Sequence, residues 1–230
     1  MKTIFNLIIN KTNGQHIIMN TLKSNLFLLL LGVLAGTSLN AQEKQKGIAT
    51  FVIYQEFDFP VETLWETVAL DYGNIINSHP AIYSSVYTKG HTEGQLGAQR
   101  KLEFNKKGTK ALTETIVSWD PENYTYNVQL DQADGFPINE EVTLATLTFK
   151  SLGPNRSSFQ FDFSYGTTPK FMAGLAKGRF KSLLQDYMIA LEHYILTGEQ
   201  VNATTGNFKD VKKAFKARHA NVQSNRVATN

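Results

Sequence analysis

The longest element that this sequence predicts is a helix at residues 169–198, which read PKFMAGLAKGRFKSLLQDYMIALEHYILTG. Pro169 is typical of a first helical turn, Thr168 is a candidate N-cap, and Gly198 is a candidate C-cap. Large apolar side chains recur at spacings of three and four, at Phe180, Leu183, Leu184, Tyr187, Met188, Leu191, Tyr194 and Ile195. Such a helix is roughly 40 Å long, enough to cross a whole curved sheet.

Upstream of this helix, the sequence predicts a sheet of about seven strands. The first strand precedes Pro60, where a short amphipathic helix at 61–68 and a short helical piece at 72–77 follow. Apolar and polar residues then alternate between turn signals, which predicts an antiparallel meander. The predicted strands are 48–59, 82–88, 98–105, 110–119, 123–131, 141–151 and 156–165. The fold class is therefore α+β, a curved antiparallel sheet with a long C-terminal helix.

Several short segments carry a family resemblance in their order and spacing. They include Phe59-Pro60-Val61-Glu62-Thr63-Leu64-Trp65, Asp71-Tyr72-Gly73, His79-Pro80, Gly97-Ala98-Gln99-Arg100, Trp119-Asp120 and Phe136-Pro137-Ile138-Asn139. Over about residues 48–196 the chain resembles the polyketide cyclase/dehydrase and lipid-transport branch of the START-like (SRPBCC) superfamily. The resemblance implies a helix-grip fold, in which the sheet wraps around the last helix over an internal pocket. It also implies a function among ligand carriers and cyclases.

An uncharged apolar run, LFLLLLGVLAG at residues 26–36, lies near the N-terminus. A membrane-spanning helix needs about 20 apolar residues, so this run has the length of a signal-peptide core. Lys23 precedes it and small residues follow, which is the layout of a cleavable leader. We expect cleavage near Ala41, with Met19 a more typical start than Met1. The chain is therefore predicted to be an exported bacterial-type protein, periplasmic or secreted.

The charges divide the chain into three parts, because the net +3 is not spread evenly. We predict a signal peptide with an N-terminal extension at 1–41, a START-like helix-grip domain at 42–198 and a basic, polar appendage at 199–230. The appendage holds enough apolar residues for a short helix at best. The domain itself is mildly acidic, so nucleic acid is not an expected partner.

The usual signatures of catalysis and cofactor binding are absent from the sequence. There is no nucleophile elbow, phosphate-binding loop, zinc-protease motif or cysteine, and the histidines are far apart. We therefore expect no cofactor and no metal. His79, beside Pro80, is expected to hydrogen-bond the backbone at a turn.

The candidate ligand-binding residues belong to the face of the sheet that is predicted to be buried. Arg100 and Glu114 alternate in phase with apolar neighbours, so both should point inward and meet across adjacent strands or meet the polar head of a ligand. The other candidates for the cavity wall are Tyr83, Tyr126, Tyr187, Phe104, Phe161 and Leu183. Gly174 and Gly178 weaken the long helix, which indicates either close packing on the strand beneath or a flexible gate.

Three functions are compatible with these patterns. The first is a carrier for a small hydrophobic or amphipathic ligand, lipid-like or polyketide-like, with no enzymatic activity. The second is a cyclase or dehydratase-like enzyme that acts on an aromatic or polyketide substrate and uses Arg100, Glu114 or a tyrosine. The third is an interaction module whose cavity is filled by its own side chains.

Overall fold

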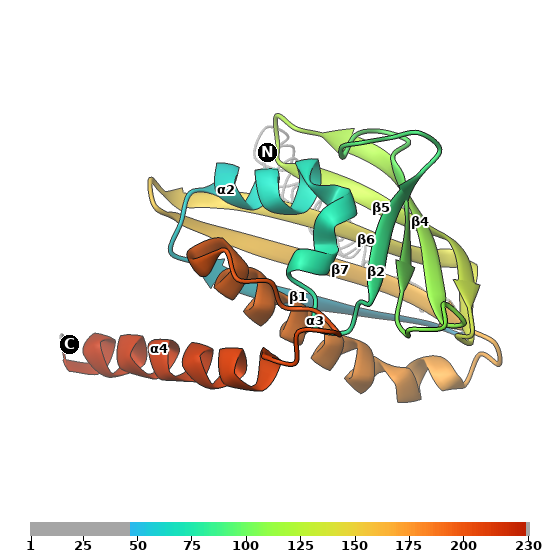
Figure 1. Cartoon of the computed structure of the whole chain (residues 1–230). Helices are drawn as coiled ribbons and strands as arrows, with labels where there is room; N and C mark the ends of the chain where they lie inside the picture. The colour runs from blue at the N-terminus through green and yellow to red at the C-terminus, as the bar shows by residue number, and fades with distance from the viewer. Residues whose placement is uncertain (1–46, 229–230) are drawn as a thin grey trace, which may run out of the picture. The chain divides into compact units, whose positions relative to one another are not determined.

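The computed structural model describes residues 47–228, with side chains up to residue 220 (Figure 1). The predicted signal peptide lies outside the described residues. Four helical segments precede or follow the strands: α2 (Val61–Trp65) with its continuation Glu66–Leu70, Tyr72–Asn77, α3 (Met172–Thr197) and α4 (Phe208–Ala228). The strands are β1 (Ile48–Phe57), β2 (Ser84–Thr88), β3 (Gln99–Glu103), β4 (Ala111–Asp120), β5 (Thr125–Asp134), β6 (Ile138–Gly153) and β7 (Arg156–Thr167).

The strands form one seven-stranded antiparallel sheet in the order β1-β7-β6-β5-β4-β3-β2. Strands β2 to β7 are a meander, and β1 closes the sheet beside β7, with Phe51 opposite Phe163. The long helix α3 lies against the curved sheet (Figure 1). This is the α+β helix-grip arrangement, and the predicted fold class is confirmed.

An aromatic cluster fixes α2 over one end of the sheet. Trp65 lies 4.7 Å from Trp119 between ring centroids and also packs against Tyr126 and Phe149. Such large side chains contribute most of the apolar area that a small core buries. This end of the interior is therefore filled by side chains of the protein itself.

Helix α3 ends where the sequence predicts and begins later than expected. Gly198 adopts the left-handed conformation (φ 72°) that favours glycine at a C-cap. Thr168 is not the N-cap, because the chain first makes a turn in which the Met172 amide donates to the Pro169 carbonyl. Helix α3 starts at Met172, and no side chain caps it.

The segment after α3 corrects the expectation of a short helix at best. Helix α4 covers 21 residues and packs against α3 through Phe208, Val211 and Phe215. Lys212 Nζ lies 2.6 Å from Asp186 Oδ1, and Arg218 and His219 both contact the buried Glu192. This part of the appendage is thus a docked helix. Among residues 47–228, no helix has the length and apolarity that a membrane crossing requires.

A candidate ligand cavity under α3

A cavity of about 120 Å³ lies between the sheet and α3. Its wall is mostly apolar and comes from strands β3 to β7, from α3 and from the segment between Ile75 and Ile82. It includes Leu102, Phe104, Val128, Leu147, Phe161 and Leu183. An apolar cavity of about 150 Å³ in another protein accepts one benzene ring. The space here therefore suits a molecule built around a single ring or a short aliphatic chain.

The charged part of the wall is the Arg100–Glu114 pair. The two residues lie directly opposite each other on β3 and β4, and Arg100 Nη2 is 2.5 Å from Glu114 Oε1. The guanidinium also lies 3.7 Å from the centre of the Tyr72 ring and donates to the Tyr72 carbonyl. Burial alone would lower the pKa of Arg100, but the adjacent Glu114 carboxylate, together with Tyr72 and Tyr126, outweighs it and raises the pKa above its ordinary value. The pair therefore adds no net charge to the cavity.

His79 forms part of the wall next to α3. Its Nδ1 accepts a hydrogen bond from the Ala81 amide at 3.2 Å, so the proton of the neutral ring is on Nε2. The ring stacks on Tyr187 with 5.2 Å between centroids. Burial, aided by the charge of Arg100, lowers the pKa of His79 to about 3. The imidazole is therefore neutral at physiological pH, and the expected backbone hydrogen bond is confirmed.

Three polar atoms in this wall have hydrogen-bonding capacity that the described residues do not use. Glu114 receives both contacts from Arg100 on Oε1, which leaves Oε2 without a partner among residues 47–220. Within the same part of the chain, no hydrogen bond involves the Tyr187 hydroxyl or His79 Nε2. One acceptor and two donors are thus available on the wall of an otherwise apolar cavity.

The polar groups favour orientation of a ligand over proton transfer. Burial raises the pKa of the Tyr187 hydroxyl, and the imidazole of His79 is too weak a base at neutral pH. Residues 47–220 contain no cluster of three histidine or acidic side chains that would hold a metal ion.

Six of the eight predicted cavity residues do line it: Arg100, Glu114, Tyr187, Phe104, Phe161 and Leu183. Tyr83 does not. Its neighbour Ile82 lines the cavity, whereas Tyr83 is 37% exposed to solvent. Tyr126 is on the inner face of β5 but belongs to the aromatic cluster, where its hydroxyl donates to the Val68 carbonyl. Whether the six residues bind a ligand stays a prediction.

Sequence reasoning did not include His79 in the cavity. The only local signal was the His79-Pro80 dipeptide, which indicates a turn but does not show that the turn faces the sheet. For Gly174 and Gly178, close packing on a strand is wrong, because a Cβ at either position would meet no atom within 4 Å.

The family model for polyketide cyclase/dehydrase and lipid-transport proteins matches residues 49–194, more than half of the chain. The chain belongs to this family. The family description names both enzymes and lipid transport. Membership therefore indicates a fold that binds hydrophobic ligands, but it does not distinguish between an enzyme and a lipid carrier. The comparison with curated proteins found no match.

Solved structures share the fold of this polyketide cyclase/dehydrase family member at low sequence identity. Ara h 8.0201 is 19% identical with a TM-score of 0.54, covering 65% of this chain and 99% of that one. The protein XoxI from Bacillus cereus is 20% identical (TM-score 0.53, 65% and 96% covered). A point mutant of norcoclaurine synthase from Thalictrum, solved with a transition-state analogue, is 13% identical (TM-score 0.51, 65% and 94% covered).

Proposed function

We propose that this protein is an exported carrier of a small, neutral, mostly apolar molecule that has one hydroxyl group. The observation behind this proposal is the cavity under α3, whose apolar wall holds unused hydrogen-bonding atoms of Glu114, Tyr187 and His79. A ligand hydroxyl can donate to Glu114 and accept from Tyr187. Lipid transport in the family description agrees with this role.

The charge of the wall argues for a neutral ligand. Arg100 is the only cationic side chain among the described residues of the wall, and Glu114 is in direct contact with it. An anionic ligand would compete with Glu114 for the guanidinium and would leave one carboxylate without its partner, which is costly in an apolar site. A fully apolar ligand would leave the polar atoms without hydrogen bonds.

A cyclase or dehydratase-like enzyme is the second candidate. The unused Oε2 of Glu114 favours it, because a carboxylate in a dry cavity is able to accept a proton from a bound substrate. Norcoclaurine synthase, an enzyme by its name, has the same fold. Turnover of a phenolic or polyketide-like compound that is lost in Glu114→Gln, with binding retained, would establish the enzyme over the carrier.

Export is the further part of the proposal, and it rests on the apolar run at 26–36. We expect the protein recovered from the culture medium or periplasm of a producing bacterium to begin near Gln42. N-terminal sequencing decides the question. An N-terminus at Met1 or Met19, with the protein retained in the cytoplasm, would contradict export.

Three matched probes test the ligand class by calorimetry at pH 7: 4-propylphenol, propylbenzene and 4-propylbenzoate. We expect 4-propylphenol to bind most tightly, propylbenzene about fivefold more weakly because the hydroxyl and its hydrogen bonds to Glu114 and Tyr187 are lost, and 4-propylbenzoate at least about tenfold more weakly. Native mass spectrometry of the purified protein should also detect a bound molecule. Equal or tighter binding of the benzoate would overturn the neutral-ligand proposal.

The variant Tyr187→Phe removes one hydroxyl from the wall without changing charge. It should weaken 4-propylphenol binding about three- to fivefold and leave propylbenzene binding unchanged or slightly tighter. Tyr83→Phe is the matched control, because it removes a hydroxyl outside the cavity. If both variants bind 4-propylphenol like the wild type, the cavity is not where the phenol binds.

A further inference from the structure

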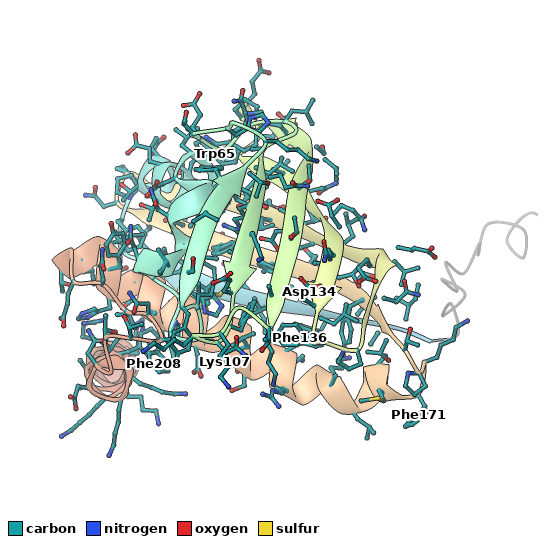
Figure 2. The ribbon with its side chains drawn as sticks, turned by 45° about the vertical axis from the view of Figure 1, so that its right-hand side comes forward. Trp65, Lys107, Asp134, Phe136, Phe171 and Phe208 are labelled. Carbon is teal, nitrogen blue, oxygen red and sulfur yellow. The ribbon has the colours of Figure 1, made fainter. Side chains whose placement is uncertain are left out.

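The N-terminal end of α3 exposes large apolar side chains. Phe171 is 73% exposed and Leu175 is 78% exposed, the highest values among the large apolar residues of the described part of the chain. Because they are four residues apart at the start of a helix, they share one face. A Cβ added at Gly174 or Gly178, beside them, would meet nothing within 4 Å outside the helix's own backbone. Phe171 lies at the periphery of the molecule, far from Phe208 of α4 (Figure 2).

The same helix end is strongly basic. Lys170, Lys177, Arg179 and Lys181 occur here, and the sequence has no acidic residue between Asp162 and Asp186. No ion pair joins any of the four to another residue of the described chain. The exposed apolar pair is therefore surrounded in sequence by uncompensated positive charge.

Over residues 208–220, helix α4 is also basic, but it exposes no large apolar side chain like those of Phe171 and Leu175. Its exposed residues include Lys209, Lys213 and Lys216, together with Asp210, Ala214 and Ala217. Among residues 208–220, its large apolar side chains Phe208, Val211 and Phe215 pack against α3. Exposed aromatic and aliphatic side chains next to basic ones are typical of helices that lie in the interface of a membrane, whereas lysines alone are typical of a solvated face.

We propose that the start of α3, defined by Phe171, Leu175 and the four basic residues, docks on a bilayer that contains anionic phospholipids. Phe171 and Leu175 enter the boundary between headgroups and acyl chains, and the cations contact the phosphates. The next turns of the same helix supply Phe180, Leu183 and Leu184 to the cavity wall. Docking therefore brings the segment that covers the cavity to the membrane, from which an apolar ligand is taken or to which it is delivered.

An environment-sensitive dye at a single position tests this proposal. The chain has no cysteine, so Leu175→Cys labels the helix end alone, and Val117→Cys, 47% exposed on β4, is the control position. Vesicles of equal parts phosphatidylglycerol and phosphatidylcholine should shift the dye emission to the blue at position 175 and leave it unchanged at 117. The local label separates this contact from any binding by the apolar run at 26–36. No shift at position 175 would overturn the proposal.

Two pairs of substitutions distinguish the basic start of α3 from the basic face of α4 as the docking surface. Because each basic residue near an anionic surface contributes about fivefold to the partition coefficient, Lys177→Ala with Arg179→Ala should weaken vesicle binding about 30-fold. Lys213→Ala with Lys216→Ala, on α4, should change it less than about threefold. The reverse result would place the docking surface on α4. A blue shift that appears without vesicles and grows with protein concentration would show self-association instead.

The docking proposal and the carrier proposal can be contradicted separately. Tyr187→Phe, which weakens 4-propylphenol binding, should leave the vesicle-induced shift unchanged. If 4-propylphenol binds as expected and no vesicle shift occurs, the docking proposal is wrong and the carrier proposal stands.

Discussion

The two halves of α3 differ in what surrounds them. From Tyr187 to His193 every residue is buried, because Tyr187, Met188 and Leu191 pack on the sheet while Ile189 and Ala190 pack on α4. From Gly174 to Gln185 no residue is fully buried. One face of this first half covers the cavity, and its other faces meet solvent.

The difference separates stability from function along one helix. Elements that open locally are those with few buried apolar contacts, and the first half of α3 has this character. The second half holds the sheet and α4 together. Substitutions in the second half should therefore lower stability, whereas substitutions on the cavity-facing side of the first half should mainly weaken ligand binding.

The largest expected effect concerns matched leucines in the two halves. Leu191 is fully buried, so Leu191→Ala should lower the free energy of unfolding by about 2 to 5 kcal/mol. Leu175→Ala removes the same atoms from an exposed side chain and should change it by less than about 0.5 kcal/mol. Urea denaturation measures both. Similar losses for the two variants would contradict the division of α3.

An intermediate effect concerns His79, which stacks on Tyr187 at the junction of the halves. Its pKa is about 3 in the folded protein and 6.5 ordinarily, so the unfolded chain binds a proton first as the pH falls. The stabilising contribution is full above pH 6.5 and is lost progressively from there down to about pH 3. At pH 5 the loss should be about 2 kcal/mol relative to pH 7.

The variant His79→Gln should therefore show a shallower loss of stability between pH 7 and pH 5 than the wild type. His91→Gln, which replaces a histidine outside the cavity wall, is the matched control and should keep the wild-type slope. Urea denaturation at the two pH values gives the comparison. An unchanged slope in His79→Gln would mean that the histidine is not buried as described.

The smallest effect concerns the helix glycines. Since a Cβ at Gly178 meets nothing within 4 Å, Gly178→Ala should stabilise the protein by about 1 kcal/mol and raise Tm by about 2 to 4 °C. Gly135→Ala is the contrast, because Gly135 has φ 70° and its Cβ would lie 2.5 Å from the Thr109 carbonyl oxygen. Thermal unfolding should show opposite signs. Destabilisation by Gly178→Ala would instead indicate that Gly178 packs closely on the strand beneath it.

The sequence was sufficient for the strands, for the end of α3 at Gly198 and for the pairing of Arg100 with Glu114. These follow from local patterns, since alternation places side chains on faces and neighbouring strands bring facing charges together. The extent of α4 did not follow, because its apolar residues Val211 and Phe215 are few. The helix depends on contacts with Asp186 and Glu192, which are distant in sequence.

The cavity itself was the hardest feature to predict. Tyr126 and Phe161 both have inward-facing positions on their strands, yet one belongs to the aromatic cluster and the other lines the cavity. The position of α2 decides between them, because Trp65 fills one end of the sheet and leaves the other end hollow. This is a property of tertiary packing, which periodicity along a single strand does not contain.

Calorimetric titration of 4-propylphenol into Leu183→Trp and Leu175→Trp tests most directly whether the space under α3 is the binding site. Both substitutions add the same bulk to α3, but only residue 183 lines the cavity. We predict that Leu183→Trp weakens binding at least about tenfold and that Leu175→Trp binds like the wild type. Equal binding by both variants, with the fold intact, would contradict the account.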